Sequence, residues 1–412
     1  MSAWRHLVPA HSPLSMAALL AGARAAAARN GGSARAEEHV VELLKERYSA
    51  MAVLLTESGT AALTAALRGA LRDRPGAAVA LPAYACYDLA TAADGAGVRA
   101  LLYDVDPHTL APDLGDVQAA LRQGAAAIVV VHLYGCPIDL APLNRLAAEA
   151  GAAVIEDAAQ AGGASVNGRP AGTQGSLVVL SFGRGKGLTG GGGALLANDA
   201  VGERFLARAR GMLGEPRRGW PELLTVAAQL LLEHPNLYAL PAALPFLRLG
   251  QTIYREPRLL RAPTRVSCPV ISATWTLAER EGEVRRCNAE RLLIELRGQP
   301  DFETISAPPN ARPGYLRLPV LASPEVRRSA ADTAARRLGV MPGYPRPLCD
   351  LERFAPRCLN RNASFPGGRQ LAGRLCTLPT HGRLGLRDLE RLEQWIRMVG
   401  GGALRRGATA GG

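Results

Sequence analysis

Lysine is nearly absent from this chain of 412 residues. Of the 48 basic side chains, only Lys45 and Lys186 are lysines, and arginine accounts for the other 46. Arginine stays protonated in proteins, whereas an amine whose pKa falls on desolvation can attack a carbonyl and form a Schiff base. Because Lys186 stands alone in a glycine-rich loop, we interpret it as a candidate nucleophile rather than a solvated loop lysine.

Metal-binding and membrane-spanning patterns are also missing. The seven cysteines are odd in number and widely spaced, and the seven histidines form no HExxH pair. We therefore expect no metal site, and reduced thiols in a cytoplasmic protein. No uncharged apolar run reaches the roughly 18 residues of a transmembrane helix. The apolar stretch from Leu14 to Ala28 is interrupted by Arg24 and follows Pro13, which is more typical of a helix start than of a signal peptide.

The chain is basic, yet it contains no basic run. Its net charge of +12 and its pI of about 9.8 favour anionic partners such as phosphorylated metabolites. The arginines are scattered and no aromatic-studded basic patch occurs, so we do not expect binding to nucleic acid. The 48% of hydrophobic and 20% of charged residues are ordinary for a globular protein.

Apolar runs alternate with helical segments through the first half of the chain. Runs of Val, Ile, Leu and Ala that do not alternate with polar residues predict strands buried on both faces, hence a mainly parallel sheet wrapped by helices in an α/β fold. We expect strands at 52–55, 77–81, 98–105, 126–131, 153–156 and 177–182, and helices at 15–28, 36–48, 61–72, 87–96, 114–122, 140–150 and 201–212.

Polar residues follow the ends of these predicted strands, where ligands bind in such sheets. Ser58-Gly59-Thr60 leads from a strand into a helix and offers free N–H groups to a phosphate. Asp157 ends one strand, and Ser181 and Lys186 follow the next. An acid and an amine so placed can hold a protonated heteroaromatic ring and join its aldehyde covalently, which is the arrangement of pyridoxal phosphate enzymes.

The second half of the chain has a different character. An apolar insertion at about 214–263 predicts a subunit interface or, as an alternative, a membrane-surface contact. We expect a large cofactor-binding domain over 1–265, which includes a break between two N-terminal helices at 30–33, a smaller C-terminal α+β domain over 266–400, and a disordered tail over 401–412. The smaller domain should hold helices at 272–297, 324–338 and 386–399 and strands at 315–321 and 375–378.

Several motifs in order resemble the DegT/StrS-type sugar aminotransferases, which belong to fold type I of the pyridoxal phosphate enzymes and have a seven-stranded central sheet. The matching pieces are LLTESGTAALTAAL, LPAYACYDLATAADGAGVRALLYDVD, VVVHLYGCPIDLAPLNRLAAEAGAAVIEDAAQAGGA, GSLVVLSFGRGKGLTGGGGALLAND and FPGGRQLAGRLCTLPTHGRLGLRDLERLEQWI.

The resemblance implies a role for each matching residue. Lys186 would be the Schiff-base lysine, Asp157 the partner of the pyridinium nitrogen, and Gln160 a neighbour of the ring hydroxyl. The phosphate would lie on Ser58, Gly59, Thr60 and Ser181.

Two positions depart from the family pattern. Cys86 stands where relatives commonly place an aromatic residue over the ring, so Tyr87, or otherwise Tyr84, would stack instead. The stretch Arg265-Val266-Ser267-Cys268 replaces an Asn-Tyr-Arg stretch that completes the neighbouring subunit's site in many relatives.

The resemblance also implies an activity. We expect an aminotransferase that moves an amino group from a donor such as glutamate to a keto sugar, linked to a nucleotide, in polysaccharide or secondary-metabolite biosynthesis. A homodimer with shared active sites is expected. Another fold type I reaction, or a pyridoxal phosphate-binding regulator without turnover, stays open as an alternative.

Overall fold

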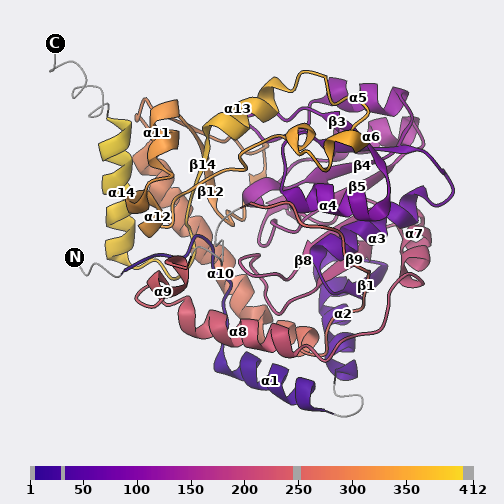
Figure 1. Ribbon diagram of the computed structural model, residues 1–412, viewed down its shortest axis with the longest axis horizontal. Coiled ribbons are helices and arrows are strands. Elements are labelled where there is room, and N and C mark those ends of the chain that lie inside the picture. The colour runs from indigo at the N-terminus through magenta and orange to yellow at the C-terminus, as the bar shows by residue number, and fades with distance from the viewer. Residues whose placement is uncertain (1–4, 29–32, 245–251, 402–412) are drawn as a thin grey trace.

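The central sheet has seven strands in the order β1-β9-β8-β5-β4-β2-β3 (Figure 1). The computed structural model describes residues 5–28, 33–244 and 252–401. All neighbouring strands in the sheet are parallel except at β9, which is antiparallel to both β1 and β8. The strands are β1 (Ala52–Thr56), β2 (Ala78–Pro82), β3 (Arg99–Tyr103), β4 (Ala125–Val131), β5 (Ala153–Asp157), β8 (Leu177–Ser181) and β9 (Gly193–Ala197).

This sheet confirms the expected α/β fold with a mainly parallel sheet. Every residue of β2 and β4 is buried, as expected for apolar runs covered on both faces. Strand β9 was not anticipated. Gly190, Gly191 and Gly192 all have positive φ and turn the chain back after the lysine loop, so that Gly193–Ala197 pairs antiparallel with β8.

Helices cover the sheet at the predicted places. The most buried of them is α3, which packs on the sheet with its N-terminus just past the end of β1. Figure 1 shows these helices around the sheet at the right of the molecule. They are α2 (Ala34–Tyr48), α3 (Gly59–Leu71), α4 (Tyr87–Ala96), α5 (Leu114–Arg122), α6 (Ala141–Glu149) and α7 (Ala200–Arg210), with a short 3₁₀ turn η1 (Leu133–Gly135) after β4.

A second, four-stranded antiparallel sheet in the order β10-β12-β14-β13 forms the C-terminal part with its own apolar core, as expected for an α+β unit. Leu7, from the other end of the chain, is buried in this core. The division at residue 265 therefore stays a prediction. The elements are α10 (Ser267–Leu296), β10 (Phe302–Thr304), β12 (Leu318–Ala322), α11 (Pro324–Ser329), α12 (Thr333–Arg337), β13 (Met341–Pro342), η3 (Leu348–Asp350), η4 (Ala355–Arg357), α13 (Pro366–Arg374), β14 (Leu375–Leu378) and α14 (Leu386–Gly400). A small sheet joins β11 (Ala311–Arg312), β6 (Ser165–Val166) and β7 (Arg169–Pro170).

Three boundaries in this half were predicted wrongly. Helix α10 begins five residues before 272, because Pro269 lies in its first turn, where a missing N–H is tolerated. The helix expected at 324–338 is two helices, since Asp332 adopts an extended conformation between them. Strand β12 begins at Leu318 rather than at Tyr315, whose φ of 41° breaks an extended run.

The apolar insertion folds against the N-terminal helix. Helix α8 (Trp220–Leu232) packs on α1 (Met16–Ala27), and α1 packs on α10. Figure 1 shows α1 and α8 together at the lower edge of the molecule, with α9 (Ala239–Ala242) beside them. No helix in the part of the chain that the structure describes is long and apolar enough to span a membrane. The break at 30–33, residues 245–251 within the insertion and the tail after residue 401 fall wholly or mostly outside the described residues.

Candidate active site

A cavity of about 490 Å³ lies at the carboxyl ends of the central strands. Residues from four separate places in the sequence line it: the start of α3, the first turns of α4, the loop after β8 and the segment 255–260. The structure therefore brings together five of the predicted site residues, which are Ser58, Gly59, Thr60, Ser181 and Lys186.

The α3 end of this cavity is suited to an anion. Gly59 and Thr60 are the first residues of the helix, so their N–H groups have no partner within it and add to the positive end of the helix dipole. The Ser58 hydroxyl accepts a hydrogen bond from Ala61 N at 3.0 Å and so caps the helix. A Cβ on Gly59 would lie 2.7 Å from the Cβ of Ser181. Only glycine allows this close approach, which places the Ser181 side chain directly beside the helix start.

Asp157 is the last residue of β5 and does not line the 490 Å³ cavity. Its Oδ1 accepts a hydrogen bond from Ala159 N at 3.0 Å. Burial raises the pKa of Asp157, while this hydrogen bond and the positive charge of Lys186 oppose the rise. The charge of Lys186 therefore reaches the Asp157 carboxylate, while the predicted pairing of both residues with one cofactor stays a prediction.

The loop that carries Lys186 is fixed by tight backbone packing. Lys186 N donates to Gly183 O at 3.2 Å. The flanking residues Gly185 and Gly187 both have positive φ, and a Cβ on them would meet Ala10 at 3.2 Å and Arg285 at 3.1 Å, respectively. Side chains are disfavoured at both positions, which explains why the lysine stands between glycines.

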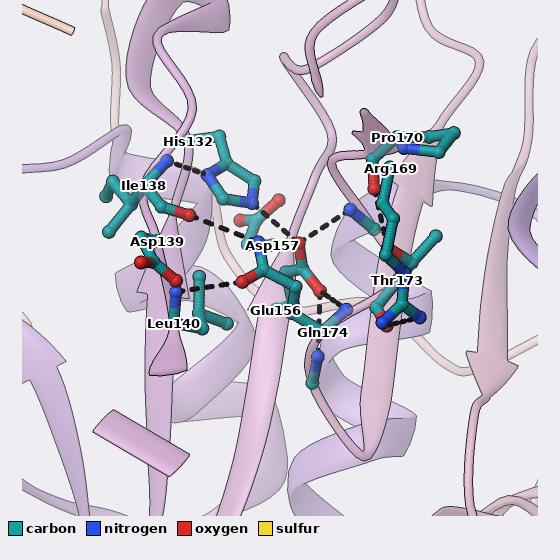
Figure 2. Close-up of polar contacts among 12 residues, drawn as sticks. His132, Ile138, Asp139, Leu140, Glu156, Asp157, Arg169, Pro170, Thr173 and Gln174 are labelled. Carbon is teal, nitrogen blue, oxygen red and sulfur yellow. Dashed lines mark hydrogen bonds and ion pairs between the residues drawn. The ribbon is translucent and has the colours of Figure 1, made fainter. Parts of the chain in front are cut away.

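A buried carboxylate holds together the strand ends behind the site. Glu156 is fully buried and accepts four hydrogen bonds, as Figure 2 shows in part. The donors are His132 Nε2 at 2.7 Å and the backbone N–H groups of Gly172 at 2.6 Å, Gln174 at 2.8 Å and Gly175 at 2.9 Å. His132 Nδ1 accepts from Ile138 N at 3.1 Å, which assigns the proton to Nε2. One side chain thus ties β4, β5 and the turn at 172–175 together next to Asp157.

Gln160 connects the site to a cluster of tyrosines. Its Oε1 accepts from Tyr134 N at 3.1 Å, and its Nε2 donates to the Tyr344 hydroxyl at 3.1 Å. The Tyr134 and Tyr344 rings are stacked with centroids 5.5 Å apart. Tyr344 is a contact that the sequence did not predict, because it lies 184 residues beyond Gln160.

Tyr87 and Cys86 are two of the residues considered for the position over the cofactor ring. Tyr87 is buried, does not line the 490 Å³ cavity, and has its ring centroid 6.5 Å from that of Tyr344. Burial raises the pKa of the Cys86 thiol to about 12, and the charges of Lys186 and Asp157 both act on it. Cys86 is therefore within electrostatic reach of both groups.

Four further polar residues that line the cavity were not predicted from the sequence. Arg255 and Arg258 come from the apolar insertion, and Asp88 and Thr91 come from the first turns of α4. The two arginines add positive charge near the helix start. The two arginines belong to the REPR stretch at 255–258. Nothing in this stretch indicates that it contacts residue 58.

Comparison with known proteins matches the part of the chain that contains Ser58, Asp157 and Lys186. Residues 23–217 match the model of the DegT/DnrJ/EryC1/StrS aminotransferase family. Over these residues the chain is similar to that family. The region is 39% identical over 155 residues to a UDP-N-acetyl-3-dehydro-alpha-D-glucosamine 3-aminotransferase of Acidithiobacillus ferrooxidans, which covers 37% of this chain and 42% of the relative. It is also 38% identical over 127 residues, 30% of this chain and 34% of the relative, to a pleiotropic regulatory protein of Geobacillus stearothermophilus.

The fold agrees over nearly the whole chain. The aminotransferase TlmJ from Streptoalloteichus hindustanus superposes with a TM-score of 0.73 at 25% identity, covering 97% of this chain and 100% of that one. The sequence matches are shorter than the structural match. This chain spans less than half of the length of the two curated relatives named above.

Pyridoxal phosphate is implied by this family and fold, and the residues present fit it. The close approach of Gly59 to Ser181 leaves a cradle of N–H and hydroxyl groups for a phosphate. A carboxylate for the ring nitrogen and an amine for the aldehyde are both present and interact.

Substitution of Glu156 tests the network in Figure 2. Burial raises the pKa of Glu156, but the hydrogen bonds from His132, Gly175 and Gly172 outweigh this, so its pKa is lowered overall. A lowered pKa means that the ionised carboxylate stabilises the fold above the unfolded-state pKa of 4.5 and that this contribution is lost as the pH falls through the lower folded-state value. Glu156→Gln should therefore cost about 3–5 kcal/mol of unfolding free energy at pH 7.

Urea denaturation at pH 7 and at pH 3.5 measures this effect. The cost of Glu156→Gln should shrink at the lower pH, whereas Glu149→Gln, an exposed glutamate on α6, should change stability by no more than about 0.5 kcal/mol. Equal costs for Glu156→Gln at both pH values would contradict a role for the ionised form.

Proposed function

We propose that the protein is a pyridoxal phosphate-dependent aminotransferase that transfers an amino group from a small-molecule donor to a keto sugar. The observation that carries the proposal is that Lys186 and the α3 phosphate cradle line one cavity although they lie far apart in sequence, and that the charge of Lys186 acts on the Asp157 carboxylate. The family of residues 23–217 supports the same reaction.

Each residue has a defined part in this proposal. The N–H groups of Gly59 and Thr60, with the hydroxyls of Ser58 and Ser181, hold the phosphate, and Gln160 lies on the side of the ring hydroxyl. Asp157 keeps the ring nitrogen protonated, and Tyr87 lies behind the site against Tyr344. Pyridoxal phosphate, when bound, supplies the electron sink for the carbanion at the amino carbon. The Lys186 amine anchors the cofactor at rest and carries the proton between donor carbon and cofactor carbon during transfer.

Donor and acceptor are assigned only by class. Glutamate is the proposed donor, and a keto sugar linked through phosphate is the proposed acceptor, since the named relative from Acidithiobacillus ferrooxidans acts on a UDP-linked sugar. We also propose a homodimer with shared active sites, in which the apolar insertion or residues 265–268 contribute to the neighbouring site.

A second candidate is a cofactor-binding regulator without turnover. Cys86 in place of an aromatic side chain and the similarity to a pleiotropic regulatory protein favour it. Release of a keto acid from a donor separates the two candidates, because a regulator would bind the cofactor and release none.

Substitution of the two lysines tests the proposed role of Lys186. The protein reconstituted with pyridoxal phosphate should absorb visible light and release one equivalent of 2-oxoglutarate from glutamate. Lys186→Arg should abolish the absorption band and slow keto-acid release at least about 100-fold, because the proton carrier is lost. Lys45→Arg, a change at an exposed position on α2, should leave both unchanged. A colourless reconstituted protein, or an equal loss of keto-acid release in both variants, would contradict the proposal.

The proposed role of Asp157 predicts opposite effects on stability and on cofactor binding. Burial raises its pKa, so ionisation of Asp157 in the cofactor-free protein destabilises the fold once the pH exceeds the unfolded-state pKa of 3.8. Asp157→Asn should therefore raise the thermal midpoint of the cofactor-free protein at pH 8 but not at pH 3.5, while lowering the affinity for pyridoxal phosphate.

Asp73→Asn, at an exposed carboxylate after α3, serves as the control and should produce neither effect. Unchanged cofactor affinity in Asp157→Asn would show that this carboxylate does not pair with the ring.

A further inference from the structure

Two cavities outside the 490 Å³ site share a wall and differ in character. The first, of about 440 Å³, is lined mainly by aliphatic groups from the N-terminal segment 8–10 and from α8, and we call it the apolar cavity. The second, of about 390 Å³, lies between the N-terminal segment and the C-terminal part and is called the basic cavity. Pro9 and Tyr238 line both. Each volume is within the roughly 300–1,000 Å³ of typical small-molecule sites.

The basic cavity is built for an anion. Arg327, Arg336 and His6 line it, and no carboxylate among the described residues does so. Arg327 Nε is buried without a hydrogen-bond partner among those residues, although its Nη2 donates to Ala372 O at 3.4 Å. Neither arginine forms an ion pair with a described carboxylate, in contrast to Arg374, which pairs with Glu303 in the same part of the chain. Arginines that converge without an acid are typical of phosphate sites.

The apolar cavity offers few free polar groups. Glu233 and Gln229 line it, but their polar atoms are turned to protein partners. Glu233 Oε2 is 2.6 Å from His11 Nδ1, and Gln229 Nε2 donates to Glu233 Oε1 at 3.4 Å. The rest of the lining is largely aliphatic, including Val8, Ala228 and Leu232. Such a lining suits an alkyl chain better than a nucleotide base, whose polar edges need partners.

Both cavities adjoin the candidate active site. The apolar cavity is lined by Arg184 and Gly185, directly before Lys186. The basic cavity is lined by Gly343 and its neighbours, which flank Tyr344, and the Tyr344 hydroxyl accepts from Gln160. Arg184 lines both the apolar cavity and the 490 Å³ cavity, so a ligand in the apolar cavity lies next to the cavity that Lys186 lines.

The exposed face of α8 continues the apolar cavity to the surface. At about 100° per residue, the exposed side chains Trp220, Leu224 and Leu231 form one stripe, with exposures of 46%, 70% and 61%. The adjacent stripe, with Thr225, Ala228 and Leu232, lines the cavity. Glu222 is the only charged residue of this helix. An aliphatic chain that enters the cavity therefore meets a continuous apolar surface as it leaves.

We propose that the acceptor is a sugar carried on a lipid phosphate, with the phosphate in the basic cavity and the lipid chain in the apolar cavity. This inference rests on the proposed function, since it names the acceptor of that reaction. The apolar insertion then serves substrate binding, with its exposed stripe facing the surface from which the lipid is drawn.

Binding of four probes to the full-length protein tests the proposal by calorimetry. Farnesyl diphosphate should bind at least about tenfold more tightly than farnesol, inorganic diphosphate or UDP, because only it fills both cavities. Equal or tighter binding of UDP would overturn the lipid assignment in favour of a nucleotide. Equal binding of farnesol would overturn the phosphate site.

Two matched pairs of variants locate the binding. Arg336→Gln should weaken farnesyl diphosphate and inorganic diphosphate about tenfold, whereas Arg328→Gln, at an exposed arginine of α11 that does not line the cavity, should weaken neither. Ala228→Asp, at an exposed position of the cavity wall, should weaken only farnesyl diphosphate, and Ala27→Asp on α1 should not. Equal effects within either pair would overturn the assigned location.

These measurements are independent of turnover. Lys186→Arg should bind farnesyl diphosphate as tightly as the unaltered protein, even if it transfers no amino group. An active aminotransferase that does not bind farnesyl diphosphate would overturn this inference and leave the proposed function intact. Conversely, a protein that binds the probe as expected but never releases a keto acid would contradict the proposed function alone.

Discussion

The buried charge of Glu156 is the interaction on which the site depends. A carboxylate with no exposed surface is stable only when nearly all of its hydrogen-bonding capacity is used, and here one imidazole and three backbone N–H groups use it. These donors belong to the end of β4 and to the turn between β7 and β8. The strand ends on either side of Asp157 are thereby held at fixed positions. The hydrogen bonds of Glu156 therefore also fix the position of the adjacent Asp157 carboxylate.

The parallel sheet explains why distant residues meet. Strands that run in one direction bring their last residues to one edge, so Asp157 ends β5 at the same edge of the sheet where Ser181 ends β8. Helix α3 then brings Gly59 against Ser181, at a distance that no side chain at 59 would permit. In the proposed function, residues at the ends of β1, β5 and β8 can therefore hold the phosphate, the ring and the aldehyde of one cofactor.

The sequence predicted this arrangement well wherever local chemistry is strong. Uninterrupted apolar runs located the strands, and the scarcity of lysine singled out position 186. The sequence did not predict β9, because the positive φ values of Gly190, Gly191 and Gly192, and hence the reversal of the chain before this strand, have no signature beyond composition. It also did not predict Tyr344 or Arg255 near the site, since contacts across 160 residues or more depend on how the C-terminal part and the insertion pack.

The apolar cavity and the basic cavity give the insertion a proposed role in substrate binding. They depend on the N-terminal segment, whose Pro9 separates them, and on Tyr238, so chain segments from the start, middle and end of the sequence are needed to form them. Their proximity to Gly185 and Tyr344 means that a change in the acceptor could be accommodated without altering the residues that hold the cofactor. Substrate choice and cofactor binding would then be separable properties of one fold.

Covalent labelling tests the central claim most directly, and the near absence of lysine makes the result unambiguous. The protein loaded with pyridoxal phosphate is reduced with borohydride, digested with protease and mapped by mass spectrometry. The account predicts that the cofactor is found on the peptide containing Lys186. Label on Lys45, or an intact chain without covalent label, would contradict it.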